Sequence, residues 1–271
     1  SIGHVNFAQG EMAMLSTFAA WQIMDYGVSY WVAFPLTVLM SFVLGVLVER
    51  VLMRPLRHAP PLSLVIVFIG LLLTINSVAG YIWSFTVKPF PSPFGTAPFL
   101  GNAWISQHQA GMMVTTLVIL VLLFVFFRST RVGLAMRGAA NNPTSARLLG
   151  IRVRTLEGLG WGMAAAIGAV GGMLIAPVVF LEPNMMSGIL LYAFASALVG
   201  GISNPAGAVA GGFIVGILEN MVAYAGNQIE KATGVYIIGN GEKLTVALII
   251  VIFVLTVKPA GLFGRVVVKR V

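Results

Sequence analysis

The amino-acid sequence predicts an all-α integral membrane protein with about eight transmembrane or partly broken helices. Apolar residues make up 58% of the 271-residue chain and charged residues only 9%, against about 45–50% and about 25% in soluble domains. The apolar residues form long runs, such as 112–127 and 244–257, without the polar alternation that a membrane β-barrel needs. Lys and Arg are concentrated in a few connections, as in multi-pass helical proteins.

Eight hydrophobic segments are candidate spans, since a helix that crosses a bilayer needs about 20 apolar residues. Backbone hydrogen bonds in lipid must be satisfied within each segment, and an α-helix satisfies them. We treat residues 1–271 as one transmembrane domain. The chain starts at Ser1 in a polar stretch, so we expect one further span before it. The eight segments lie near residues 7–24, 30–48, 62–84, 111–127, 158–181, 188–202, 206–225 and 244–257.

The cations predict the orientation, because cytoplasmic loops carry an excess of Lys and Arg. Eight spans place three cationic groups on one side of the membrane and leave Lys88, Lys231 and Lys243 on the other. We therefore expect the even-numbered connections and the C-terminus to be cytoplasmic. The net charge of +8 then reflects topology and not nucleic-acid binding. The three groups are Arg50, Arg54 and Arg57; Arg128, Arg131, Arg137, Arg147, Arg152 and Arg154; and Lys258, Arg265, Lys269 and Arg270.

Two stretches interrupt the apolar pattern and predict broken helices at membrane depth. Residues 6–11 read Asn-Phe-Ala-Gln-Gly-Glu, and residues 200–212 contain five glycines and Pro205. Unwound backbone inside a bilayer persists only where protein or a water-filled path covers it. The second stretch also fits close helix packing, for which small residues four positions apart are typical, as at Gly207/Gly211 and Gly212/Gly216.

Polar side chains at membrane depth are candidates for lining a translocation path. Glu11 opens the first span, and Glu219 lies late in the seventh. Such a carboxylate either pairs with an ammonium group on the path or forms hydrogen bonds that hold helices together, and both interpretations stay open. The path candidates are Asn6, Gln9, Glu11, Ser203, Asn204 and Glu219.

No pattern in the chain predicts an enzyme. The sequence has no GxxxxGK[ST] phosphate loop, no HExxH motif and no Ser/His/Asp set on neighbouring polar elements. It has no cysteine, and His4, His58 and His108 match no metal-ligand spacing. We expect no catalytic residue, metal or cofactor in this chain, and any ATP hydrolysis that powers it belongs to another chain.

The longest cytoplasmic loop, at about 128–157, predicts a short capped helix. Asn142 is a good N-cap, Pro143 suits the first helical position, and Gly150 follows Leu149 as a stop signal. We expect this helix to expose Ala146, Leu149 and a basic rim. It either inserts into a groove of another protein or lies at the bilayer interface with its arginines on lipid phosphates.

The whole chain resembles the permease subunits of bacterial branched-chain amino acid (leucine/isoleucine/valine) ABC importers. No single motif is specific for this family, but the order and spacing of the motifs together are. Gln9 departs from the pattern, since family members often have His there. The resemblance is carried by 5–11 (Val-Asn-Phe-Ala-Gln-Gly-Glu), 49–57 (Glu-Arg-Val-Leu-Met-Arg-Pro-Leu-Arg), 133–151 around Asn142-Pro143 and Ala146-Arg147-Leu148-Leu149-Gly150-Ile151, Phe194-Ala195, Gly200-Gly201, 207–212, Leu218-Glu219, and 258–264 (Lys-Pro-Ala-Gly-Leu-Phe-Gly).

The resemblance implies an ABC-importer permease fold in the bacterial inner membrane. The subunit would translocate branched-chain or related amino acids that an extracytoplasmic binding protein delivers. Its implied partners are a second permease subunit, in a homodimer or heterodimer, and two cytoplasmic ATPase subunits that hold ATP and Mg. The loop helix would be the coupling helix, and its residues in an ATPase groove would be Asn142, Pro143, Ala146, Arg147, Leu149 and Gly150.

Three alternatives remain at this stage. Related permeases of the same family serve urea, short amides or aromatic acids. A stand-alone ion-coupled secondary transporter or channel explains broken helices equally well, but not a capped basic helix in a long loop. An assembly subunit without a path of its own is the third.

Overall fold

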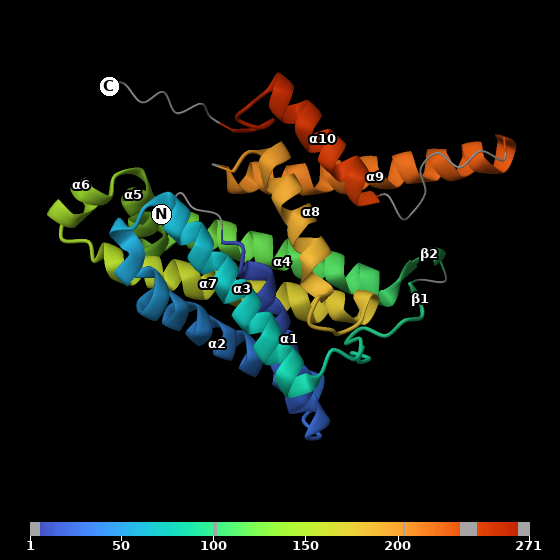
Figure 1. The fold of residues 1–271 in the computed structure, drawn as a ribbon, viewed down its shortest axis with the longest axis horizontal. Helices are drawn as coiled ribbons and strands as arrows, with labels where there is room; N and C mark the ends of the chain where they lie inside the picture. Colours follow the sequence, from blue (N-terminus) through green and yellow to red (C-terminus); the bar gives the residue numbers. More distant parts are fainter. Residues whose placement is uncertain (1–5, 100–101, 203, 234–242, 265–271) are drawn as a thin grey trace. The chain divides into compact units, whose positions relative to one another are not determined.

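The computed structural model describes residues 6–99, 102–202, 204–233 and 243–264. The chain forms two compact units, Ser1–Met186 (unit 1) and Ser187–Val271 (unit 2). Within the described ranges the regular structure is helical apart from one short β-hairpin (Figure 1). The predicted all-α fold is confirmed.

Unit 1 contains the first seven helices and the hairpin. A π-helical turn, η1, continues α2 without a break, and a 3₁₀ turn, η2, follows it. The elements are α1 (Gln9–Asp25), α2 (Tyr30–Val48), η1 (Glu49–Met53), η2 (Pro55–His58), α3 (Pro61–Trp83), β1 (Pro98–Phe99), β2 (Asn102–Ser106), α4 (Gln107–Ser129), α5 (Arg131–Asn141), α6 (Pro143–Leu148) and α7 (Val153–Val179).

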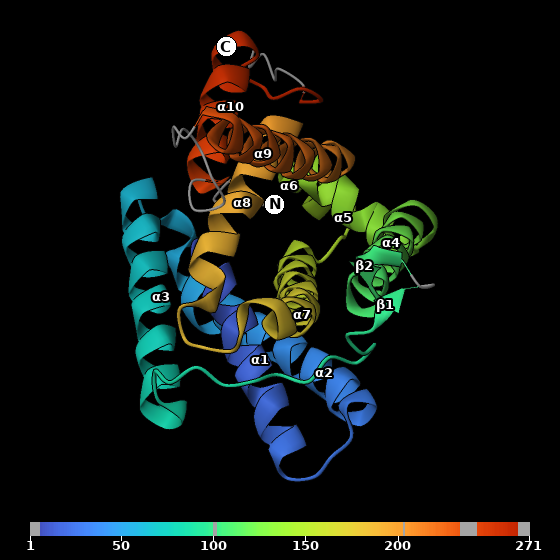
Figure 2. The ribbon, with the colours of Figure 1, turned by 90° about the vertical axis from the view of Figure 1, so that its right-hand side faces the viewer.

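Helices α1, α2 and α7 pack against one another and form the core of unit 1 (Figure 2). Small residues allow this close approach: a Cβ atom on Gly45 would lie 2.5 Å from the carbonyl oxygen of Trp161. A chain of hydrogen bonds also joins the three helices. The Ser16 hydroxyl lies 2.9 Å from that of Ser41, which donates to the carbonyl of Ala165 at 2.8 Å. Small-residue contacts and hydroxyl hydrogen bonds are typical of packing between membrane helices.

The connection between α3 and α4 is fastened to α7 through His108, which is buried. Its Nε2 lies 2.8 Å from the carbonyl oxygen of Leu174, and its Nδ1 lies 2.8 Å from the Ser92 hydroxyl. Because a carbonyl oxygen only accepts, Nε2 carries the hydrogen. The first turn of α4 is closed by a capping box between Ser106 and Gln109.

Unit 2 contains α8 (Met185–Gly200) from Ser187 onward, α9 (Pro205–Thr233) and α10 (Lys243–Val257). Its packed centre is formed by Ala195 and Val199 of α8, Val215 of α9, and Ala247 and Val251 of α10. Gly200, at the end of α8, packs directly against the backbone of Gly207. The close-packing interpretation is confirmed for this stretch.

The glycine pairs of α9 differ from one another. A Cβ atom on Gly207 or Gly211 would meet the backbone of α8, whereas nothing lies within 4 Å of one on Gly216. The pair Gly207/Gly211 is therefore a packing contact within unit 2, and the expectation for the pair Gly212/Gly216 is wrong at Gly216.

All eight predicted spans correspond to a helix. The differences lie at the ends: α7 begins at Val153 and not near 158, and α9 continues to Thr233. In the described part of the chain, Tyr30–Met53, Pro61–Trp83, Gln107–Ser129, Val153–Val179 and Ala206–Ala232 are long and apolar enough to cross a membrane, and Met185–Gly200 and Leu244–Val257 are shorter apolar helices.

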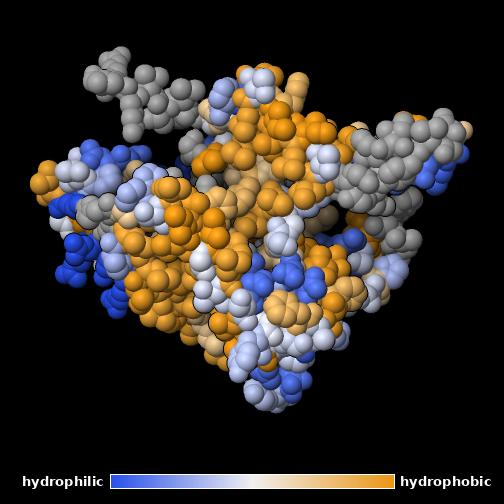
Figure 3. Space-filling model, viewed as in Figure 1, coloured by the Kyte–Doolittle hydropathy of each residue, from blue (hydrophilic) through white to orange (hydrophobic). Residues whose placement is uncertain are grey.

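The surface of unit 1 has large apolar areas, and hydrophilic atoms gather at the left end and at the bottom of the view (Figure 3). Exposed apolar side chains on α2 and α3 include Leu39, Val43 and Ile66. Hydrophilic atoms gather at the end that carries α5 and α6, at the left in Figures 1 and 3. Turn η1 packs against the early part of α7, where Glu49 lies beside Gly158, so Arg50 and Arg54 belong to the same end of unit 1 as α5 and α6. The orientation of these spans across the membrane stays a prediction from the cations.

Candidate functional site

The segment between α4 and α7 holds two short helices, α5 and α6, where the sequence predicts a long loop with one. Helix α5 is capped by Thr130, whose hydroxyl accepts from the Gly133 N–H at 2.9 Å, and its far end turns directly into α6. Sequence reasoning missed α5, although Thr130 is an N-cap residue three positions before Gly133. The first five residues of α7, Val153 to Glu157, also lie inside the range expected to be loop.

Helix α6 is fixed at its start as the sequence predicts. The Asn142 side chain accepts a hydrogen bond from the Ser145 N–H at 3.0 Å, and Pro143 occupies the first helical position. The missing N–H of proline costs nothing there, because the first N–H groups of a helix have no partner within the helix. The N-terminal boundary of the predicted helix is confirmed.

The end of α6 is a Schellman motif. The N–H of Gly150 donates to the carbonyl of Arg147, and the N–H of Ile151 donates to the carbonyl of Ala146, both at 3.0 Å. Gly150 has φ +79°, a left-handed conformation that glycine adopts without strain. The predicted stop at Gly150 is confirmed.

One expectation about this helix is wrong. Ala146 is only 4% exposed, because it packs against Ala139 of α5 and Val153 of α7. The exposed apolar pair is Leu148 and Leu149, at 85% and 81%. The burial of Ala146 follows from α5, which the sequence interpretation did not include. Ala146 therefore anchors α6 to unit 1, while the two leucines are presented outward.

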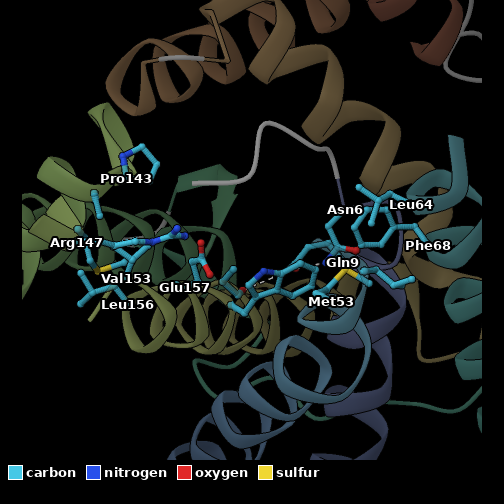
Figure 4. A pocket seen from close by; sticks show the side chains of 16 residues that line it. Asn6, Gln9, Met53, Leu64, Phe68, Pro143, Arg147, Val153, Leu156 and Glu157 are labelled. Carbon is cyan, nitrogen blue, oxygen red and sulfur yellow. Dashed lines mark hydrogen bonds between the residues drawn. The ribbon is translucent and has the colours of Figure 1, made fainter. Parts of the chain in front are cut away.

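A cavity of about 520 Å³ opens between α6 and the core of unit 1 (Figure 4). Arg147 of α6 and Glu157 of α7 point toward one another at one end of it. Phe68 and Trp161 stack in its wall, with ring centroids 6.1 Å apart. Its lining residues are Asn6, Gln9, Met53, Leu56, Leu64, Phe68, Met136, Ala139, Pro143, Arg147, Val153, Leu156, Glu157, Gly160, Trp161 and Ala164.

Two of the predicted path residues line this cavity. The Gln9 amide donates to the carbonyl of Ala164 at 2.8 Å and accepts from the Asn6 amide at 3.3 Å. Asn6 also accepts from the Ala8 N–H at 3.0 Å, so it orders the turn that precedes α1. The structure thus brings Asn6 and Gln9 together with the coupling candidates Pro143 and Arg147, which the sequence treated separately.

Glu11 lies elsewhere in unit 1, where it is 5% exposed. Asn76 of α3 lies within donor distance of Glu11 Oε2 at 3.3 Å, the Pro183 carbonyl at 2.9 Å and Asn184 Oδ1 at 3.2 Å. Because an amide has two N–H bonds, it serves at most two of these acceptors at once. This contact joins α1 to α3, as the helix-holding interpretation of Glu11 expects. Sequence reasoning missed Asn76, the one amide side chain in α3.

The remaining path candidates belong to unit 2 or lie outside the described residues. Asn204 donates to the carbonyl of Phe263 at 3.2 Å, so it ties the start of α9 to the turn after α10. Glu219 lies on α9 and is half-buried. Ser203 lies outside the described residues. The role of all six residues as path lining stays a prediction.

Comparison with known proteins identifies the family. Residues 1–257 match the family model of the branched-chain amino acid transport system permease component. The chain belongs to this permease family. It is 29% identical over 288 residues to the Salmonella typhimurium high-affinity branched-chain amino acid transport system permease protein LivH, covering 100% of this chain and 89% of that protein.

Two further relatives extend this match to other organisms. The Pseudomonas aeruginosa permease protein BraD is 28% identical, covering 100% of this chain and 89% of the relative. The probable branched-chain amino acid transport permease protein LivH of Methanocaldococcus jannaschii is 26% identical, and the match covers 96% of this chain and 82% of that protein. No solved structure matches the chain.

Membership in the permease family makes the chain a transmembrane component of a transport system with several components. It is a multi-pass membrane protein and not the subunit that performs catalysis. A permease component of this kind is neither a stand-alone secondary transporter nor an assembly factor, so these two alternatives are set aside.

The structure explains one stretch that carried the family resemblance. The N–H groups of Leu262 and Phe263 donate to the carbonyls of Val199 and Gly200, at 2.7 and 3.1 Å. These bonds cap the end of α8, and Gly261 supplies the required turn with φ +80°. In this permease the 258–264 sequence is thus a helix-capping turn of unit 2.

Proposed function

We propose that this chain is the permease subunit of an ATP-driven importer of branched-chain or related amino acids. An extracytoplasmic binding protein delivers the amino acid to it. Two cytoplasmic ATPase subunits, which hold ATP and Mg, drive it. The names of its relatives, all branched-chain amino acid permeases, support the substrate class.

The observation that carries the coupling step is the construction of α6. The helix is capped at both ends, anchored through buried Ala146, and presents Leu148 and Leu149 beside Arg147. Two adjacent leucines at more than four-fifths exposure are costly in water and are suited to a groove in a partner. We propose that an ATPase subunit covers this surface, with Asn142, Pro143, Arg147, Leu149 and Gly150 forming or shaping the contact.

The proposed mechanism is alternating access. ATP binding draws the two ATPase subunits together, and α6 passes this movement to α7 and α5, which hold Ala146. The two permease subunits then rock and open a central path between them. A second permease, identical or homologous, completes that path. The orientation of the chain in the membrane is inferred from its Lys and Arg residues, which are typically in excess on the cytoplasmic side. This places α5, α6 and the C-terminus in the cytoplasm.

Gentle purification from the native membrane, followed by mass spectrometry, tests the partner proposal. The expected result is co-purification of two ATPase subunits and a second permease copy. Recovery of the chain alone, or as a simple homo-oligomer without an ATPase, contradicts it.

The coupling proposal is tested in the reconstituted complex by the ATPase activity that the loaded binding protein stimulates. Arg147→Glu and Gly150→Val should abolish this stimulation, the first by charge and the second because valine disfavours φ +79°. Both variants should remain folded, since neither residue is buried. Stimulation at the wild-type level contradicts the coupling role.

A further inference from the structure

The cavity behind α6 has the size and lining of a small-molecule site. Its volume of about 520 Å³ falls within the range of about 300–1,000 Å³ that is common for ligand pockets. Such pockets combine mainly apolar walls with a few polar groups that orient the ligand. Both components are present here, at different places along the cavity (Figure 4).

The apolar part is formed by Met53 at the end of η1, Phe68 of α3 and Trp161 of α7. Phe68 is buried and lies nearly parallel to the Trp161 ring, at an interplanar angle of 20°. The rings and the Met53 thioether form a surface for an aliphatic side chain, because these groups gain from excluding water and from close contact.

The charged part lies at the α6 end. Arg147 and Glu157 come from two different helices and direct opposite charges toward the same space. A guanidinium binds a carboxylate through paired hydrogen bonds, and a carboxylate binds an ammonium group. Opposite charges beside an apolar wall match a zwitterion with an aliphatic side chain better than they match a lipid tail or a simple anion.

We propose that this cavity binds a free aliphatic α-amino acid from the cytoplasmic side, with its carboxylate on Arg147 and its ammonium group on Glu157. Its side chain lies against Phe68 and Trp161. This inference rests on the proposed function in two respects. The proposed function places α6 on the cytoplasmic side, and it makes the imported amino acid the solute that the cavity meets there. A bound product joins α6 to α7 through its two charges and holds the coupling segment still.

The regulatory consequence is inhibition by product. The ATPase movement must displace α6, and an amino acid bound between Arg147 and Glu157 stabilises the undisplaced arrangement. A ligand shifts such an equilibrium only through different affinity for the two states, and this site exists in full only while α6 stays in place. Product on the cytoplasmic side should therefore lower stimulated ATPase activity.

The chain offers a matched pair of variants for the test. A Cβ atom on Gly160 has only the Met136 methyl within 4 Å, at 3.5 Å, and faces the cavity. Nothing lies within 4 Å of a Cβ atom on Gly171, which is exposed on the same helix and outside the cavity lining. Gly160→Leu fills the cavity, and Gly171→Leu is its control with the same change in helix propensity.

The experiment measures equilibrium binding of L-leucine to the full chain in lipid nanodiscs, without binding protein or ATPase. We expect saturable binding to the wild type and to Gly171→Leu, and at least tenfold weaker binding to Gly160→Leu. Leucinol, which lacks the carboxylate, and 4-methylpentanoate, which lacks the ammonium group, should each bind at least tenfold more weakly than leucine.

Three results overturn the inference: no leucine binding by the wild type, equal binding by Gly160→Leu, or equal binding of all three probes. None of them affects the proposed function, since import with the ATPase and the binding protein is measured separately. A complex that imports leucine while the isolated permease fails to bind it rejects the product site alone.

Discussion

Two parts of unit 1 are held together in different ways. The core of α1, α2 and α7 depends on residues far apart in the chain, such as Gly45 against Trp161 and Ser41 against Ala165. Helix α6 depends mainly on bonds within 142–151, and buried Ala146 is its main link to the rest. The core resists change through packing, whereas α6 is locally stable and free to face a partner.

This difference separates fold from coupling. A substitution in the core is expected to lower the free energy of unfolding and to remove function only through loss of folded protein. A substitution on the outer side of α6 is expected to leave the fold intact and to remove the response to the ATPase.

The largest effect on stability is expected from Gly45→Val. Its Cβ atom would lie 2.5 Å from the Trp161 carbonyl oxygen and 2.8 Å from Ala165 Cβ, so α2 and α7 must separate. Overpacking of this kind costs about 1–3 kcal/mol. Thermal unfolding in detergent should show a lower midpoint than for Gly70→Val, where nothing lies within 4 Å of the new Cβ. Equal midpoints would mean that α2 and α7 are not held by this contact.

The largest effect on coupling is expected from the double variant Leu148→Glu/Leu149→Glu. Both side chains are exposed, so the unfolding midpoint should stay at the wild-type value. Loss of a central apolar contact in an interface costs about 2 kcal/mol or more, which corresponds to about 30-fold weaker ATPase binding. Pull-down of the ATPase subunit measures this loss. Unchanged binding would remove the leucine pair from the interface.

A smaller loss of stability is expected from Asn76→Leu. The substitution removes the amide that donates near Glu11 and the Pro183 carbonyl. The buried Glu11 carboxylate then loses this donor, which should lower the free energy of unfolding by about 1–3 kcal/mol. Thr74→Val is the control on the same helix, because that hydroxyl donates only to the carbonyl of Gly70 one turn before. The midpoint should fall for Asn76→Leu and change little for the control. If transport fails while stability is retained, Glu11 has a role on the path and not in holding helices.

The smallest effect is expected from Asn142→Ala. Loss of this N-cap removes the acceptor of the Ser145 N–H and costs about 1 kcal/mol locally. Amide hydrogen exchange at Ser145 should speed up, and stimulated ATPase activity should fall in part. Asn141→Ala, one residue earlier and at the end of α5, is the matched control. Equal exchange rates in the two variants would show that the cap does not stabilise α6.

The sequence by itself determined the elements with strong local signals. The eight apolar segments correspond to eight helices, because about 20 apolar residues in lipid have no better way to satisfy their backbone. The limits of α6 followed from Asn142, Pro143 and Gly150, since capping depends on neighbours in the chain. The family resemblance rested on motif order along the chain, and the match over residues 1–257 confirms it.

Only the tertiary structure decided what lies next to what. The burial of Ala146, the contact of Asn76 with Glu11, and the meeting of Gln9 with Arg147 in one cavity join residues that are 7 to more than 100 positions apart. Periodicity and capping signals extend over a few residues, so they predict which side chains share a helix face. They do not predict which faces meet, because that depends on the packing of all helices at once.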